Sequence, residues 1–167
     1  MTNPLILITG ASSGIGKEMA KILAKQKYDL VLVARSADKL TELATQLTTA
    51  HQVKVETLPI DLSTPDGAYK VYDEVTRLEL NVTMLVNNAG FGVYGNFTDT
   101  DLDRELKMMT VNMNAVVILT KLFVQDMINH RHGKIMNVAS LLSFLPFPYY
   151  SVYSATKSFI LSFSETL

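Results

Sequence analysis

Short apolar runs alternate with segments of helical periodicity along the whole chain, and this alternation constrains the fold more than any other feature. The apolar runs predict strands at Leu5–Thr9, Leu30–Ala34, Val53–Ile60, Val82–Val86 and Lys134–Val138. Between them, apolar residues recur at the spacing of an amphipathic helix. The predicted helices are Ile15–Gln26, Asp38–Thr48, one that begins at Pro65, Asp101–Asn129 and Ser151–Leu167. Strands that alternate with helices pair in parallel through right-handed crossovers, so we expect an α/β, doubly wound Rossmann-type parallel sheet in the order 3-2-1-4-5.

The bulk composition sets limits on domain count, partners and location. A chain of 167 residues fits one domain, and a hydrophobic fraction of 48% is ordinary for a globular protein. The net charge of −1 argues against a nucleic-acid partner and against an anionic membrane. The absence of cysteine excludes disulfides and thiolate chemistry and fits a reducing compartment. The sequence has neither a signal peptide nor a run of about 20 apolar residues, so we expect a cytoplasmic protein without a membrane span.

Three glycines, Gly10, Gly14 and Gly16, lie between the first predicted strand and the first predicted helix. Small residues there let the backbone approach a pyrophosphate, and the start of the helix offers free N–H groups to it. The P-loop of nucleoside triphosphatases is the rival phosphate site. However, Ala11 stands where its first glycine belongs, and Glu18 stands where its magnesium-binding hydroxyl belongs. The turn therefore predicts a dinucleotide site.

The second predicted strand ends in Ala34-Arg35-Ser36, without the acidic residue that often holds the ribose 2′-hydroxyl of NAD. The planar guanidinium of Arg35 can instead pair with a 2′-phosphate. The alternative is a solvated surface arginine. This strand end favours NADP(H) over NAD(H) as the cofactor.

Tyr153 and Lys157 are four residues apart, which places them on one face of a helix. A neighbouring ammonium group stabilises a phenolate, so the pair makes a sensible general acid/base for a carbonyl–alcohol reaction. Such a pair alone is weak support, but Ser140 follows the fifth predicted strand and the turn Asn87–Gly90 follows the fourth. Ligand sites in open α/β sheets lie beyond the carboxyl ends of strands, so we expect these residues to meet.

Taken together, these motifs resemble the short-chain dehydrogenase/reductase family over essentially the whole chain. The matching segments are Thr-Gly-x-x-x-Gly-x-Gly at Thr9–Gly16, Asn-Asn-Ala-Gly at Asn87–Gly90, Asn112, Ser140, and Tyr153-x-x-x-Lys157. The resemblance implies an NADPH-dependent oxidoreductase that transfers hydride between nicotinamide and a carbonyl or secondary alcohol substrate. The cofactor-binding residues that follow are Gly10, Ser12, Ser13, Gly14, Ile15, Gly16, Arg35, Asp61, Asn88, Ala89, Gly90, Tyr153 and Lys157.

The resemblance also implies a role for each catalytic residue. Tyr153 exchanges a proton with the substrate oxygen, and Ser140 hydrogen-bonds that oxygen. Lys157 binds the nicotinamide ribose and stabilises the phenolate, and Asn112 holds a water that relays protons. Asp61 contacts the adenine amino group. The alternatives are structural: Asn112 as a buried helix-capping or kink residue, and Ser140 as a turn residue at the strand end. Asp61 is also a candidate cap for the helix near Pro65, a role that does not exclude its contact with adenine.

The loop after Ser140 departs from the family pattern, because many members carry a glycine shortly after the serine and this chain has Leu141-Leu142-Ser143-Phe144 instead. Ser143 is thus a second candidate hydroxyl, although spacing favours Ser140. The aromatic residues of this loop indicate an apolar substrate pocket, and they are equally consistent with ordinary loop packing. These residues are Phe144, Phe147, Tyr149 and Tyr150.

Family members are usually longer than this chain, so we expect residues 1–167 to form a single dinucleotide-binding domain that lacks the C-terminal strands. A complete parent chain would be a homodimer or homotetramer. The alternative function is a truncated, non-catalytic dinucleotide-binding module. We expect no metal site: Asp99, Asp101 and Asp103 begin like a calcium loop, but Arg104 occupies the position of its essential glycine and Thr110 that of its bidentate glutamate.

Overall fold

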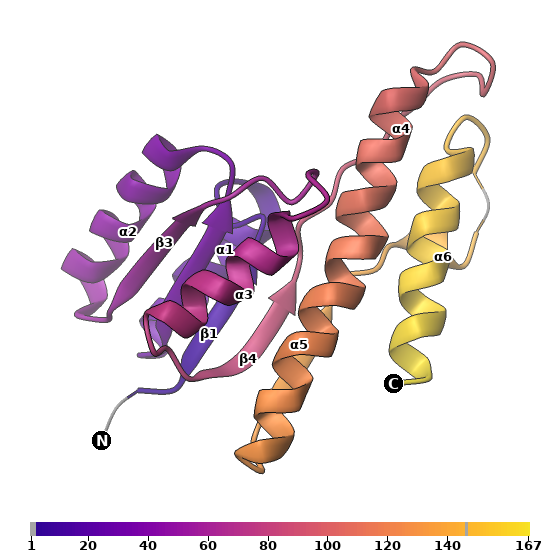
Figure 1. Ribbon diagram of the computed structural model, residues 1–167. Helices are drawn as coiled ribbons and strands as arrows, with labels where there is room; N and C mark the ends of the chain where they lie inside the picture. Colours follow the sequence, from indigo (N-terminus) through magenta and orange to yellow (C-terminus); the bar gives the residue numbers. More distant parts are fainter. Residues whose placement is uncertain (1–2, 146) are drawn as a thin grey trace.

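A parallel sheet covered by helices on both faces forms the centre of the computed structural model, which describes residues 3–145 and 147–167 (Figure 1). The strands are β1 (Leu5–Thr9), β2 (Asp29–Ala34), β3 (Val55–Pro59), β4 (Val82–Asn87) and β5 (Lys134–Asn137). Their order is β3-β2-β1-β4-β5, and every pair is parallel. The predicted doubly wound sheet is therefore confirmed, with β5 at one edge of the described part.

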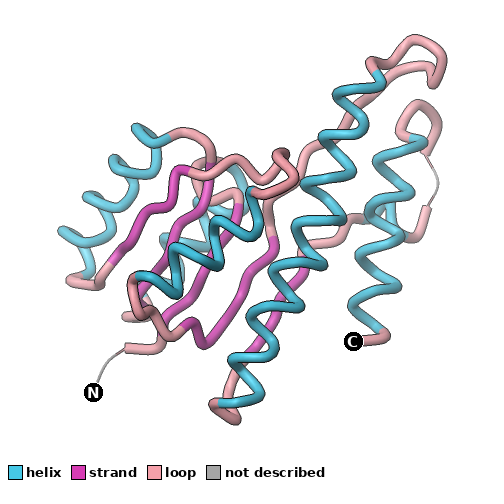
Figure 2. The backbone as a smooth tube through the Cα atoms, in the orientation of Figure 1, coloured by secondary structure: helices cyan, strands magenta, loops and turns pink. Residues whose placement is uncertain are grey.

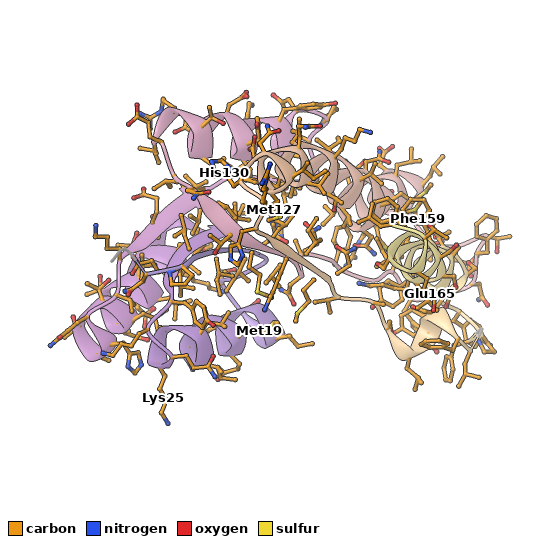
Figure 3. The ribbon with its side chains drawn as sticks, turned by 90° about the horizontal axis from the view of Figure 1, so that it is seen from below. Met19, Lys25, Met127, His130, Phe159 and Glu165 are labelled. Carbon is orange, nitrogen blue, oxygen red and sulfur yellow. The ribbon has the colours of Figure 1, made fainter. Side chains whose placement is uncertain are left out.

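Helices lie on each side of this sheet. They are α1 (Gly14–Lys25), α2 (Ala37–His51), α3 (Gly67–Arg77), α4 (Leu102–Met109), α5 (Ala115–Asn129) and α6 (Ser151–Glu165), with a short 3-10 turn, η2 (Leu141–Ser143). In Figure 3, Met19 and Lys25 of α1 lie on one side of the sheet, and Met127 of α5 and its C-cap residue His130 lie on the other. The last helix, α6, runs beside the column formed by α4, α5 and the segment between them (Figure 2), and it contacts α4 and that segment.

Alternating strand residues build the two halves of the core. Leu7 and Val31 pack toward α3 and α5, whereas Ile6, Ile8 and Leu30 pack toward α1 and α2. All of these side chains are buried. Because both faces of the sheet are covered at its centre, β1 and β2 read as nearly continuous apolar runs, whereas β3 and β5 at the edges are partly exposed.

The helix predicted over Asp101–Asn129 is continuous but not uniform. A π-helical segment, η1 (Thr110–Asn114), joins α4 to α5. Within the described residues, the column Leu102–Asn129 is long and apolar enough to cross a membrane by length and composition, and 44% of its most apolar window is buried in the fold. Core helices of soluble proteins pass the same test, so the expected absence of a membrane span stays a prediction.

The third helix begins at Gly67 rather than at Pro65. The chain from Asp61 to Gly67 first makes two successive turns, closed by hydrogen bonds from the Thr64 amide to the Asp61 carbonyl (3.4 Å) and from the Gly67 amide to the Thr64 carbonyl (3.1 Å). Pro65 therefore lies inside a turn, and its suitability for a first helical position did not decide where the helix starts.

Candidate active site

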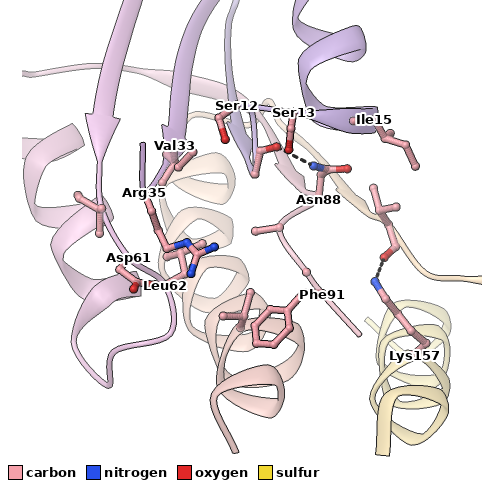
Figure 4. Close-up of a pocket in the computed structure, with 18 of the residues that line it drawn as sticks. Ser12, Ser13, Ile15, Val33, Arg35, Asp61, Leu62, Asn88, Phe91 and Lys157 are labelled. Carbon is pink, nitrogen blue, oxygen red and sulfur yellow. Dashed lines mark hydrogen bonds between the residues drawn. The ribbon is translucent and has the colours of Figure 1, made fainter. Parts of the chain in front are cut away.

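A cavity of about 380 Å³ opens at the carboxyl edge of the sheet (Figure 4). Its wall takes residues from the segments that follow all five strands and from α6. Most of the predicted site residues line it: Gly10, Ser12, Ser13, Gly14, Ile15, Arg35, Asp61, Asn88, Ala89, Gly90, Tyr153 and Lys157. Gly16, Asn112 and Ser140 are not in this wall, and each has another place in the structure.

The glycine turn closes one end of the cavity. Gly10 and Gly14 have φ values of +68° and +53°, the left-handed region that favours glycine. A Cβ atom on Gly16 would lie 2.5 Å from the side-chain nitrogen Nδ2 of Asn88. Gly16 therefore lets α1 pack directly against the turn after β4. Ser13 is the N-cap residue of α1, but its side chain makes no capping hydrogen bond. The first-turn N–H groups thus stay available to an anionic ligand.

Thr9 opens the glycine motif, and its role in the site was not predicted. Its buried hydroxyl accepts hydrogen bonds from the Asn88 and Ala89 amides, both at 3.0 Å, and donates to the Val86 carbonyl. The Asn88 side chain returns a 2.9 Å hydrogen bond to the Thr9 carbonyl. These contacts fix the turn after β4 against the turn after β1. The threonine that opens the glycine motif was the available signal.

Arg35 and Asp61 lie at the neighbouring ends of β2 and β3. In Figure 4 they stand on one side of the cavity and Lys157 on the other. The Asp61 carboxylate accepts a hydrogen bond from the Ser63 amide at 2.9 Å, so it closes the turn after β3. The N-cap residue of α3 is Asp66, so the role predicted for Asp61 as that helix's cap is wrong.

Tyr153 and Lys157 share one face of α6, as predicted from their spacing. The Lys157 ammonium lies 6.0 Å from the centroid of the Tyr153 ring. It donates a 2.7 Å hydrogen bond to the Val138 carbonyl, just beyond β5. The lysine is buried, and burial lowers the pKa of Lys157 because desolvation disfavours the charged amine.

Asn112 lies in the π-helical segment η1 and is almost fully buried, at 1% exposure. Its amide nitrogen donates to the Phe91 carbonyl at 3.1 Å and to the Thr156 hydroxyl at 3.0 Å. Its amide oxygen accepts from the Phe91 amide at 3.2 Å. Asn112 therefore ties the loop after β4 and the helix α6 to the α4–α5 column. The water-holding role stays a prediction.

The two candidate serines are used differently. The Ser140 hydroxyl accepts a hydrogen bond from the Leu142 amide at 3.2 Å, and within the described residues its own hydrogen has no acceptor. The Ser143 hydroxyl accepts from the Ser140 amide at 3.2 Å and donates to the Lys157 carbonyl at 2.8 Å. Only Ser140 therefore keeps a hydrogen that it can offer to a substrate, which agrees with the choice made from spacing.

A row of aromatic rings leads away from Tyr153. Tyr150 lies 5.7 Å from it, centroid to centroid, and Tyr94 lies 5.0 Å from Tyr150. Phe147 and Tyr149 flank these two rings. Tyr94, Phe147 and Tyr149 are each more than half exposed, so these rings present an apolar surface beside the tyrosine of the cavity.

The described residues contain no group of three or more histidine, aspartate or glutamate side chains placed to hold a metal ion. Asp101 instead caps α4, since its carboxylate accepts a 2.7 Å hydrogen bond from the Arg104 amide. Asp99 bonds to the side chains of Asn96 and Thr98, which lowers the pKa of that carboxyl.

A family model described as short chain dehydrogenase matches residues 4–167. The very-long-chain 3-oxoacyl-CoA reductases of Bos taurus and Homo sapiens are each 35% identical to the chain, over 96% of it and 52% of their own length. The chain thus spans about half the length of these curated relatives.

Solved structures agree with the family model. A short-chain dehydrogenase from Sphingobium yanoikuyae in complex with NADPH matches with a TM-score of 0.93 and 36% identity, over 98% of this chain and 64% of that one. L-Sorbose reductase from Gluconobacter frateurii, complexed with NADPH and L-sorbose, matches with a TM-score of 0.92 and 32% identity, over 99% and 63%. The motifs, the fold and the family model point the same way, and the chain belongs to the short-chain dehydrogenase family.

Proposed function

We propose that this chain carries the cofactor site and the proton-transferring residues of an NADPH-dependent oxidoreductase that interconverts a carbonyl and a secondary alcohol. One observation carries the proposal: Arg35 and the Tyr153–Lys157 pair line the same cavity. A cation at one side and an acid/base pair at the other match the two ends of a phosphorylated nicotinamide dinucleotide.

The residues present fit such a cofactor. The open start of α1 and the glycine turn suit a pyrophosphate, and Arg35 suits a 2′-phosphate with no carboxylate beside it at the end of β2. Asp61 is the candidate for the adenine amino group, and Lys157 for the nicotinamide ribose. Two of the structural relatives are NADPH complexes, which supports this choice. Bound there, the nicotinamide supplies the hydride.

The chain's own residues handle the proton and the developing charge. Tyr153 gives its proton to the carbonyl oxygen during reduction and removes it from the alcohol during oxidation. The Lys157 ammonium stabilises the phenolate left behind. Ser140, whose hydroxyl hydrogen has no acceptor within the described residues, donates to the substrate oxygen as negative charge grows there.

The aromatic row around Tyr150 favours a substrate with an apolar part next to its carbonyl. Its rings adjoin Tyr153 and remain partly exposed. The curated relatives are named very-long-chain 3-oxoacyl-CoA reductases, and a structural relative at 30% identity is a bulky-bulky ketone specific alcohol dehydrogenase. We therefore place 3-oxoacyl thioesters and bulky ketones first among the substrates to be tested.

The test combines cofactor titration with a substrate series. NADPH should bind more tightly than NADH and should be oxidised in the presence of 3-oxoacyl thioesters of increasing chain length. Since each buried CH₂ contributes about 0.8 kcal/mol, KM should fall with each extension until the aromatic row is covered. A flat KM across the series would contradict the apolar assignment.

A second candidate function, a dinucleotide-binding module without turnover, gives a different result in the same assay. NADPH would bind, and no carbonyl in the series would be reduced. The measurement therefore separates the two functions on one sample.

A further inference from the structure

We propose that Ser143 is a positioning residue that sets the active-site serine Ser140 against the helix carrying Tyr153 and Lys157. The inference rests on the proposed function, because it assigns Ser143 a part in that reaction. It concerns a residue whose hydroxyl already donates to the Lys157 carbonyl.

The hydrogen bonds of Ser143 close a ring. Its hydroxyl accepts from the Ser140 amide at 3.2 Å and donates to the Lys157 carbonyl at 2.8 Å. The Lys157 ammonium donates to the Val138 carbonyl at 2.7 Å, and Val138 lies two residues before Ser140 in the chain. Lys157 is thus held at both its backbone and its side chain.

This ring fixes the relative placement of the reacting groups. Tyr153 lies one turn before Lys157 on α6, so an anchor on the Lys157 backbone is also an anchor for Tyr153. The Ser140 amide is held by the same hydroxyl, while the Ser140 side chain stays able to donate. One hydroxyl group therefore couples the serine loop to the tyrosine helix.

A direct catalytic part for Ser143 does not fit these contacts. Its single hydroxyl hydrogen points to the Lys157 carbonyl, so it has none left for a substrate oxygen. Its role must pass through Ser140 and α6. That role is distinct from general bracing of the turn η2, since Ser158 also docks this turn on α6, by donating to the Ser143 carbonyl at 3.1 Å.

The first test compares three single variants. Ser143→Ala should lower kcat by about tenfold to a hundredfold, because misplacement by about 1 Å can cost about a hundredfold, while the NADPH dissociation constant changes by less than about twofold. Ser143→Thr keeps the hydroxyl and should recover most of kcat. Ser158→Ala removes the neighbouring hydrogen bond and should leave kcat within about twofold of the wild type, because it does not reach Ser140.

A double-mutant cycle then tests whether Ser143 acts through Ser140. In a Ser140→Ala background, adding Ser143→Ala should lower kcat by a clearly smaller factor than it does in the wild type, since one of the groups that it positions is already gone. Independent, multiplicative losses would overturn the proposal. An unchanged kcat in Ser143→Ala would also overturn it.

Amide hydrogen exchange supplies a readout that does not depend on turnover. The Ser140 amide should exchange faster in Ser143→Ala than in the wild type, and Ser143→Thr should restore its protection. Equal protection of the Ser140 amide in the wild type, Ser143→Ala and Ser143→Thr would overturn the proposal. If the wild type reduces no carbonyl, the proposed function itself is wrong, whereas an active wild type and an impaired Ser140→Ala beside a fully active Ser143→Ala refute the positioning role alone.

Discussion

Arg35 stands at the end of β2, where dinucleotide-binding proteins that prefer NAD carry an acidic residue. Its side chain is exposed at the rim of the cavity, and no carboxylate adjoins it in sequence. An exposed cation contributes little to stability by itself. Its effect should therefore appear in cofactor choice and not in folding.

Replacing Arg35 by alanine should remove the preference for NADPH. Hydrogen bonds to charged groups contribute about 1.5–3 kcal/mol, so the dissociation constant for NADPH should rise by about ten- to a hundredfold, with that for NADH nearly unchanged. Fluorescence titration with both cofactors checks this. Lys39→Ala, which removes an exposed cation from α2, is the matched control. A preference that survives in Arg35→Ala would refute the assignment.

Single residues of the site were predictable where a motif names a side chain. Gly10 and Gly14 of the glycine turn line the cavity as expected, and so do Arg35, Tyr153 and Lys157. The contacts of Val138 and Phe91 were not predictable. These residues act through their backbone carbonyls, and the fold alone determines which side chains reach those carbonyls. Sequence patterns report side-chain chemistry and carry little information about a carbonyl.

Among the secondary-structure elements, the strands were predicted to within two residues at each end. The buried strands β1 and β2 leave a continuous apolar run, whereas the partly exposed strands β3 and β5 leave a weaker, interrupted one. The π-helical segment η1 was not predicted. Its register follows from Asn112, whose side chain bonds to Phe91 and Thr156, 21 and 44 residues away along the chain. Helical periodicity is a local signal, so it predicts the helix but not a bulge that distant partners stabilise.

The contact between α1 and the turn after β4 leads to a prediction about Gly16. In Gly16→Ala the new Cβ would lie 2.5 Å from both the side-chain nitrogen Nδ2 of Asn88 and the Gly10 carbonyl oxygen, so α1 must shift. We expect a loss of about 1–3 kcal/mol in the free energy of unfolding, together with weaker NADPH binding. Urea denaturation and cofactor titration measure the two effects.

Glu18→Ala, on the exposed side of the same helix, provides the comparison for Gly16. Within the described residues Glu18 pairs only with Lys21, at the surface, so the free energy of unfolding should change by less than about 0.5 kcal/mol. If Gly16→Ala is as stable as Glu18→Ala, the close packing of α1 on Asn88 is not what requires a glycine there.

At the scale of the whole molecule, the site belongs to no single segment. The order β3-β2-β1-β4-β5 brings the turns after all five strands to one edge, and α6 completes the wall from beside the α4–α5 column. The topology could be predicted from the alternation of strands and helices, and it already implied that the motifs would meet. The docking of η2 on α6 could not be predicted, because hydrogen bonds from a hydroxyl to a carbonyl, such as that from Ser143 to Lys157, produce no periodic pattern in the sequence.

The most direct measurement compares turnover and cofactor binding in Tyr153→Phe with those of the wild type. The substitution removes only the phenolic hydroxyl that exchanges the proton, so NADPH oxidation with an accepted carbonyl should fall by about a hundredfold to ten-thousandfold. The NADPH dissociation constant should stay within about threefold of the wild type, since the ring and Lys157 remain. Turnover that survives in Tyr153→Phe at the wild-type rate would contradict the assignment of this cavity as an oxidoreductase site with a tyrosine acid/base.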